Sequence, residues 1–190
     1  MKNKFIILWS DKHMQIAIDR MCFQLIEHHG NFEECCILGI QHKGVLLAER
    51  IVTRLKQINK KLQIKLGKLD ITFSRDDFRH SNKIINAYPN KMDFLIENQK
   101  VILVDDVLYT GRTIQAALLE LQNYGRPRSV ELLVLIDRRL NRQLPIQADY
   151  YGTTVDALDE SYVKVDWKEE DGADRVLFYE ADRNKSSQII

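Results

Sequence analysis

Short runs of almost wholly apolar residues alternate along the chain with segments in which apolar residues recur at helical spacing. The apolar runs predict strands covered on both faces; they are 35–40, 101–104 and 129–136. The segments with helical spacing predict helices that begin near Ser10 or Asp11, at Gly44 and near Ile114. Strands that alternate with helices predict the α/β class, with a parallel sheet flanked by helices on both faces.

Weaker signals complete the predicted fold. Residues 66–73 alternate apolar and polar positions and predict a further strand, and shorter β candidates lie around Tyr150, at 163–165 and at 176–179. Gly30 is expected to end the first helix and Gly125 the third. The third helix has an expected core stripe made of Ile114, Ala117, Leu118 and Leu121.

Residues 74–98 are polar and show no clear period. A loop of this length inside a compact domain is uncommon and usually has a function, such as covering an active site. We therefore expect a lid here. The chain length of 190 residues favours one domain that spans 1–190.

Composition is ordinary for a globular protein, with 45% hydrophobic and 29% charged residues. No apolar run approaches the roughly 20 residues that a membrane helix needs, and the N-terminus lacks a signal-peptide cleavage pattern. The odd number of cysteines, Cys22, Cys35 and Cys36, indicates reduced thiols rather than disulfides. These features predict a cytoplasmic protein without a membrane partner.

The net charge of +1 hides a regional split. Cations are in excess from Lys43 to Lys68 and again from Arg126 to Arg142, whereas the stretch from Asp156 to Asp174 is acidic. A basic face could bind a polyanion such as RNA. Solvated surface lysines are the alternative interpretation of most of these residues.

The strand 101–104 leads into the polar stretch DDVLYTGRT, residues 105–113. Ligands bind beyond the carboxyl ends of parallel strands, where Gly111 allows close approach and Thr110 and Thr113 add donors to the free amides that hold a phosphate. The carboxylates of Asp105 and Asp106 can accept hydrogen bonds from a vicinal diol. Together these groups predict a site for a ribose 5-phosphate; a pair of turn aspartates before a capped helix is the structural alternative.

The stretch VILVDDVLYTGRT resembles the phosphoribosyl-diphosphate binding motif of type I phosphoribosyltransferases. The likeness is closest to the bacterial pyrimidine operon attenuation proteins, which are bifunctional uracil phosphoribosyltransferases. It extends through CILGIQHKGVLLAERI, LDITFSRDD and LPIQADYYG, and covers roughly residues 10–180. The resemblance implies a five-stranded parallel core, a small hood and a flexible lid loop.

The resemblance also implies a reaction, a cofactor and partners. Ribose 5-phosphate would be transferred from its 1-diphosphate to uracil, with release of diphosphate and with Mg²⁺ as cofactor. Leader RNA of a pyrimidine operon would be a second partner, and the protein would form a homodimer or a larger homo-oligomer. No His, Cys, Asp or Glu spacing typical of a metal site is visible, so no residue is expected to be a dedicated metal ligand.

Individual residues receive roles by the same likeness. Asp105 and Asp106 would be catalytic, because carboxylates stabilise positive charge that develops on the ribose ring. The residues expected to bind substrate are His42, Lys43, Gly44, Arg75, Val107, Leu108, Tyr109, Thr110, Gly111, Arg112, Thr113, Asp137, Arg138 and Val155.

The chain departs from the family pattern in two loops. His42 and Lys43 stand where the family has Thr-Arg, and the stretch DRRLNRQLP is one residue longer than the family's Asp-Arg-Gly-His-Arg-Glu-Leu-Pro and gains Arg139. Purine-salvage relatives carry a carboxylate at the position of Tyr109, so Tyr109 favours a pyrimidine. Two alternatives stay open: an RNA-binding attenuator of pyrimidine genes with little enzyme activity, and a purine phosphoribosyltransferase.

Overall fold

The computed structural model of the chain describes residues 5–72, 92–157 and 161–180. Five strands form a central sheet in the order β3-β2-β4-β5-β6, and every neighbouring pair is parallel. The strands are β2 (Cys35–Ile40), β3 (Lys65–Leu69), β4 (Lys100–Leu108), β5 (Ser129–Arg138) and β6 (Tyr150–Val155). The expected α/β class and five-stranded parallel core are confirmed.

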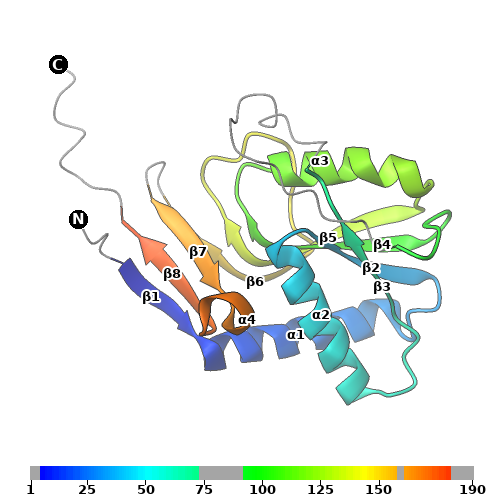
Figure 1. Cartoon of the computed structure of the whole chain (residues 1–190), viewed down its shortest axis with the longest axis horizontal. Helices are drawn as coiled ribbons and strands as arrows, with labels where there is room; N and C mark the ends of the chain where they lie inside the picture. The colour runs from blue at the N-terminus through cyan, green and yellow to red at the C-terminus, as the bar shows by residue number, and fades with distance from the viewer. Residues whose placement is uncertain (1–4, 73–91, 158–160, 181–190) are drawn as a thin grey trace.

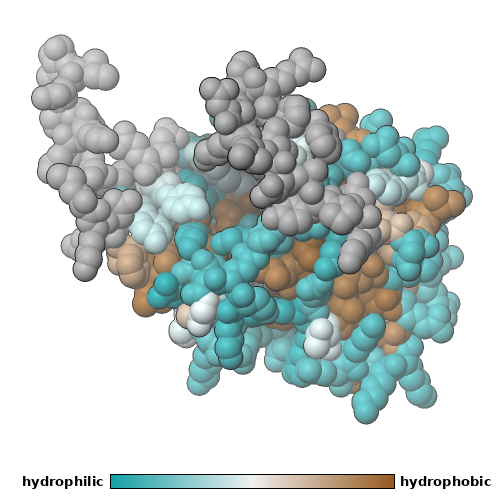
Figure 2. Space-filling model, in the orientation of Figure 1, coloured by the Kyte–Doolittle hydropathy of each residue, from teal (hydrophilic) through white to brown (hydrophobic). Residues whose placement is uncertain are grey.

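Three helices cover the two faces of this sheet (Figure 1). Helices α1 (Asp11–His29) and α2 (Lys43–Ile58) lie on one face, and α3 (Arg112–Leu121) lies on the other. Hydrophilic residues cover most of the molecular face seen in Figure 2, with smaller hydrophobic areas between them. Among the described residues, no helix combines the length and apolar character needed to cross a membrane.

Each face of the sheet has its own apolar core, because side chains alternate along the strands. Ile37 and Ile102 belong to the core beneath α1 and α2, whereas Leu38 and Leu103 belong to the core beneath α3. This double burial explains why the runs 35–40, 101–104 and 132–136 are apolar without interruption. The three cysteines are buried free thiols, as expected.

The prediction for the third helix is correct for the residue that ends it but not for its whole core stripe. A 3₁₀ turn, η2 (Gln122–Tyr124), continues the helix, and Gly125 ends it with a φ of +126°. Leu118 was expected in the core stripe, but it is 39% exposed, so this part of the prediction is wrong. Leu118 lies at the margin of the stripe, where it lines an open hollow with Pro127 and Val130.

A second, smaller sheet stands beside the central one (Figure 1). Its strands β1 (Phe5–Ser10), β8 (Arg175–Tyr179) and β7 (Tyr162–Asp166) are antiparallel neighbours in that order, and α4 (Lys168–Asp171) lies between β7 and β8 in the chain. We call these four elements the hood. The resemblance predicted a hood, but sequence reasoning did not identify β1 as a strand.

Two predicted boundaries are wrong. Strand β3 ends at Leu69 rather than at residue 73, because the Asp70 carboxylate accepts a hydrogen bond from the Thr72 amide at 2.8 Å and turns the chain. The expected lid extended to residue 98, yet Ile96 is fully buried and its amide donates to the carbonyl of Tyr124. The rest of the expected lid, residues 74–91, lies outside the described residues.

Arg50 of α2 fastens the hood to the helix layer. Its guanidinium lies 2.7 Å from the Asp174 carboxylate, 2.6 Å from the Glu169 carboxylate and 4.7 Å from the ring centre of the fully buried Trp167. The side chain of Asp174 is only 8% exposed. Removal of the guanidinium would leave this carboxylate buried without its partner, which is far more costly than the loss of an exposed ion pair.

Arg50→Ala is therefore expected to reduce the free energy of unfolding by about 3 kcal/mol. Arg54→Ala is a matched control on the same helix, because Arg54 pairs with Asp19 but both side chains are more than a third exposed, at 37% and 42%. We expect this control to lose much less, because exposed ion pairs contribute little to stability. Urea unfolding followed by circular dichroism measures both losses, and equal losses would contradict the role of Arg50.

Candidate active site

Polar residues gather where the parallel strands end. In the register of the sheet, Leu108 at the end of β4 lies beside Asp137 of β5, and Arg138 lies beside Val155 of β6. The β-sheet thus brings candidate residues from three strands to one edge. Among the predicted substrate-binding residues, Arg75 lies outside the described part of the chain.

A close backbone contact at Gly44 holds the loop after β2 against the end of β4. A β-carbon at Gly44 would lie 2.4 Å from the carbonyl oxygen of Val104 and 3.3 Å from a carboxylate oxygen of Asp105. Only glycine permits this approach, because any side chain would overlap the β4 backbone. The contact brings Lys43, which follows the cis Gln41–His42 peptide, close enough to Asp106 of β4 for its charge to act on that carboxylate.

The two candidate catalytic aspartates lie within β4 rather than after it. The sequence predicted a strand that ended at residue 104, but pairing with β5 continues to Leu108. The Asp105 carboxylate accepts a hydrogen bond from the Asp106 amide at 2.9 Å. Burial raises the pKa of Asp106, while the charge of Lys43 and hydrogen bonds from backbone amides act in the opposite direction. The fold therefore resists ionisation of one member of the pair.

The turn between β4 and α3 is the predicted phosphate loop. Gly111 adopts a φ of +94°, which other residues rarely adopt, and it is the N-cap residue of α3. The hydroxyl of Thr110 accepts a hydrogen bond of 3.4 Å from the Arg112 amide. Since the first amides of a helix have no partner within the helix, the turn and Thr113 can offer donors to an anion.

Arg138 and Arg142 organise the side of the site nearest β5. Arg142 donates to the carbonyl oxygen of Tyr109 and forms an ion pair with the Asp137 carboxylate. The guanidinium of Arg138 lies 3.8 Å from the ring centre of Tyr109, and Arg138 is only 4% exposed. These contacts join the loop after β4 to the loop after β5, and Arg142 was missed because its only sequence signal was a place in a cationic stretch.

The longer loop after β5 lies against the candidate phosphate loop. The amide of Gln143 donates to the carbonyl of Thr110 at 3.0 Å, and its side-chain oxygen accepts from Arg112 at 2.8 Å. Leu140 and Asn141 have positive φ angles of 28° and 67°. The extra residue is thus accommodated by a local left-handed bend, which places Gln143 beside the turn.

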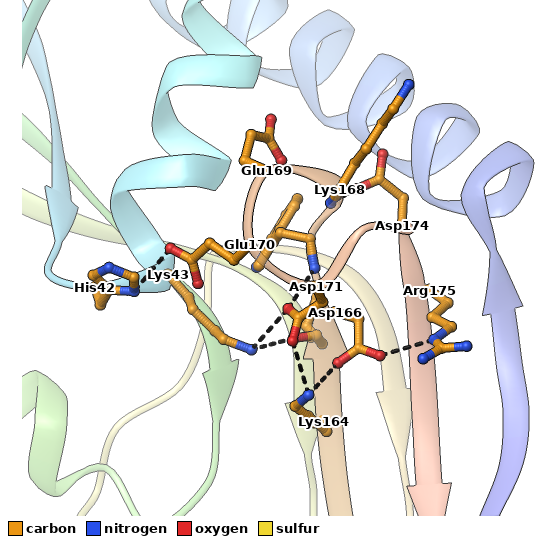
Figure 3. A network of polar contacts seen from close by, with 12 residues as sticks. His42, Lys43, Lys164, Asp166, Lys168, Glu169, Glu170, Asp171, Asp174 and Arg175 are labelled. Atoms are coloured by element: carbon orange, nitrogen blue, oxygen red, sulfur yellow. Dashed lines mark hydrogen bonds and ion pairs between the residues drawn. The ribbon is translucent and has the colours of Figure 1, made fainter.

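His42 and Lys43 face the hood (Figure 3). The Nδ1 atom of His42 lies 3.1 Å from the Glu170 carboxylate. The Nζ atom of Lys43 donates to the carbonyl of Val165 and lies 4.0 Å from the Asp171 carboxylate. Sequence reasoning did not connect the acidic C-terminal stretch with these cations, because no local pattern signals a contact between such distant segments.

The carboxylate pair fits a magnesium ion that is shared with a substrate. Asp105 and Asp106 carry the hard oxygen atoms that Mg²⁺ prefers. Among the described residues, no group of three or more His, Cys, Asp or Glu side chains could hold a metal ion by itself. Such an ion would therefore take most of its ligands from substrate and water, and the expected use of Mg²⁺ stays a prediction.

Comparison with protein families and curated proteins gives a consistent result. Residues 10–170 match the phosphoribosyl transferase domain family. The chain is 38% identical over 184 residues to the bifunctional protein PyrR of Bacillus mycoides, which covers 95% of this chain and 99% of that protein. It is also 38% identical over 182 residues to the bifunctional protein PyrR of Bacillus cereus, with the same coverage.

Solved structures are similar in fold at much lower identity. The hypoxanthine phosphoribosyltransferase of Trypanosoma cruzi has a TM-score of 0.68 and 14% identity, covering 93% of this chain and 97% of that chain. The hypoxanthine phosphoribosyltransferase of Staphylococcus aureus has a TM-score of 0.68 and 19% identity, covering 95% and 93%. At these identities the likeness supports the fold alone.

Asp106→Asn is expected to stabilise the fold at neutral and higher pH. Because folding raises the pKa of Asp106, the folded state binds more protons than the unfolded chain between the two pKa values, and stability falls as pH rises through that window. An amide cannot ionise, so the variant escapes this loss, whereas near the unfolded pKa of about 4 it gains little.

Thermal unfolding of wild type and variant at about pH 4 and about pH 8 measures this difference. Asp93→Asn is the control, because Asp93 is exposed and precedes the opposite end of β4. A difference in melting temperature that does not change with pH would contradict the prediction.

Proposed function

This chain belongs to the phosphoribosyl transferase family, and we propose that it transfers ribose 5-phosphate from 5-phosphoribosyl 1-diphosphate to uracil, with release of diphosphate. The observation that carries the proposal is the combination in the last part of β4 and the turn that follows it, where the Asp105–Asp106 pair lies two residues before the strand ends and Gly111 caps the start of α3. A carboxylate pair beside a cluster of amide donors matches a sugar that bears hydroxyls at one end and a phosphate at the other.

The carboxylates have a role in the chemical step. Cleavage of the bond to the leaving diphosphate develops positive charge on the ribose ring. Asp105 and Asp106 would accept hydrogen bonds from the two ribose hydroxyls and stabilise this charge, while the amides and hydroxyls of 110–113 would hold the 5-phosphate. Because Asp105 is fixed by a backbone hydrogen bond, its carboxylate is oriented before substrate binds.

The leaving diphosphate would lie against the loop after β2. There the backbone at Gly44 and the charge of Lys43 face the end of β4, and Lys43 supplies charge without the two-pronged contact of an arginine. A bound Mg²⁺ would supply charge neutralisation of the diphosphate oxygens, with Asp105 and Asp106 as its nearest carboxylates. Arg75 would belong to the predicted lid, which would exclude water from the reaction.

Uracil is the proposed base for two reasons. The curated relatives that match 95% of the chain are PyrR proteins, whereas the hypoxanthine enzymes are related in fold only. Tyr109 also stands where purine-salvage relatives carry a carboxylate. The base would lie near Asp137, Arg138 and the backbone at Val155, which the sheet register places side by side.

RNA binding is the second proposed function, and we rank it below the enzyme. It is supported by the relatives, which are bifunctional proteins, and by the resemblance of the sequence to pyrimidine operon attenuation proteins. Part of the cation excess is neutralised within the fold, since Arg50, Arg54 and Lys68 form ion pairs. Exposed Lys56 and Lys60 at the end of α2 are left to attract a polyanion.

The enzyme assignment predicts diphosphate release when Mg²⁺, 5-phosphoribosyl 1-diphosphate and uracil are supplied. We expect uracil to exceed cytosine, hypoxanthine, guanine and xanthine in this assay. Asp105→Asn and Asp106→Asn should each cut turnover about a hundredfold, because each removes charge stabilisation from the transition state. Circular dichroism checks that both variants fold, and Asp93→Asn should retain the wild-type rate. Wild-type turnover by both active-site variants would refute the diol assignment.

The RNA assignment predicts that a pyrimidine-operon leader transcript shifts in a gel more readily than an unrelated RNA of equal length. Lys56→Ala combined with Lys60→Ala should weaken this binding and flatten its salt dependence, because fewer counterions are released. Equal affinity of the wild type for the two RNAs would reject specific leader recognition.

A further inference from the structure

The α4 turn of the hood places acidic side chains against the first half of α2 (Figure 3). Glu170 lies 3.1 Å from His42 and Asp171 lies 4.0 Å from Lys43, both in the loop proposed to receive diphosphate. Glu169 belongs to the same turn but instead contacts Arg50, one helical turn or more further along α2. Two acidic residues of the turn, Glu170 and Asp171, therefore face the candidate site, whereas Glu169 helps to anchor the hood to α2.

Asp171 is fixed in this position. Its carboxylate accepts a hydrogen bond from the Trp167 amide and another from the ammonium of Lys164, each at 3.0 Å. These contacts, chiefly the one from Trp167, lower the pKa of Asp171, so that it is ionised at neutral pH. Since Arg50 also fastens the turn to α2, the carboxylate cannot move away from Lys43 without disturbing the hood.

This arrangement opposes diphosphate in two ways. A diphosphate that approaches Lys43 meets the negative charges of Asp171 and Glu170, and it must compete with them for Lys43 and His42. Charges of equal sign a few ångströms apart repel, most strongly where water is partly excluded. Lys43 is only 26% exposed, so the competition takes place in a partly desolvated setting.

We propose that Glu170 and Asp171 are positioning residues that set the affinity of the site for diphosphate, by holding His42 and Lys43 toward the hood until diphosphate displaces them. The inference rests on the proposed function and assigns it a further pair of residues. Weaker binding of diphosphate favours its departure as product, and product release often limits turnover.

The test measures binding of magnesium diphosphate by isothermal titration calorimetry, which needs no turnover. Glu170→Gln and Asp171→Asn remove one charge each, and the asparagine can still accept the hydrogen bond from the Trp167 amide. We expect each variant to bind magnesium diphosphate about two- to fivefold more tightly, the range for partly exposed ion pairs. The KM for 5-phosphoribosyl 1-diphosphate should fall by a similar factor without a rise in kcat.

Two controls separate the contact from a general charge effect. Glu169→Gln removes the same charge from the same short helix but faces Arg50, so its diphosphate affinity should stay at the wild-type value. Asp171→Glu keeps the charge and should also bind as the wild type does. The inference would be overturned if Glu169→Gln raised the affinity for magnesium diphosphate as much as Asp171→Asn does. It would also be overturned if Glu170→Gln and Asp171→Asn both bound magnesium diphosphate more weakly than the wild type.

Different results would reject the proposed enzyme function and the proposed role of Glu170 and Asp171. If the wild type binds magnesium diphosphate and the variants tighten as expected, but no nucleobase is turned over, the enzyme assignment fails and the role of the hood acids stands. If uracil is turned over while the variants leave both diphosphate affinity and KM unchanged, only the hood inference fails. A wild type without affinity for magnesium diphosphate would reject both.

Discussion

The candidate site depends on the close contact between the backbone at Gly44 and the end of β4. A β-carbon there would lie 2.4 Å from the Val104 carbonyl oxygen, and one at Gly39 would lie 2.7 Å from the α-carbon of Val45. Two glycines therefore let α2 begin directly over the strand ends. A side chain at either position would lift the loop away, and Lys43 would no longer face Asp106. Groups from two strands are thus held together by rigid elements rather than by flexible loops.

This contact creates a row of alternating charge. Lys43 lies between the acidic end of β4 and the acidic turn of the hood, and its charge lowers the pKa of both Asp106 and Asp171. Burial nevertheless dominates at Asp106, where the pKa remains raised. A carboxylate whose ionisation the fold opposes costs stability at neutral pH, and a perturbed pKa of this kind is expected where residues serve a ligand rather than the fold. The anchoring of the hood by Arg50 supplies stability elsewhere.

Local signals predicted the central sheet, and distant contacts explain what the sequence did not reveal. Runs such as 101–104 were identifiable because both faces of β4 are buried, but two aspartates are poor strand formers, so their inclusion in β4 required the partner strand β5. Strand β1 pairs Phe5 with Tyr179 across nearly the whole chain. The aspartate pair and the turn at Gly111 were predictable from residue order, whereas Arg142 and the hood acids reach the site only through tertiary contacts.

The fold itself does not choose the base, since it is shared with hypoxanthine enzymes at 14% and 19% identity. The base would instead be selected by side chains at the edge of the candidate site, and in this chain several of these side chains contact one another. Arg138 covers the ring of Tyr109, and Arg142 joins the Tyr109 carbonyl to the Asp137 carboxylate. A carboxylate at position 109 would lie near the Arg138 guanidinium, which would compete with a purine nitrogen for it. In the proposed site, selection of the base would rest on this group of four residues together, rather than on Tyr109 alone.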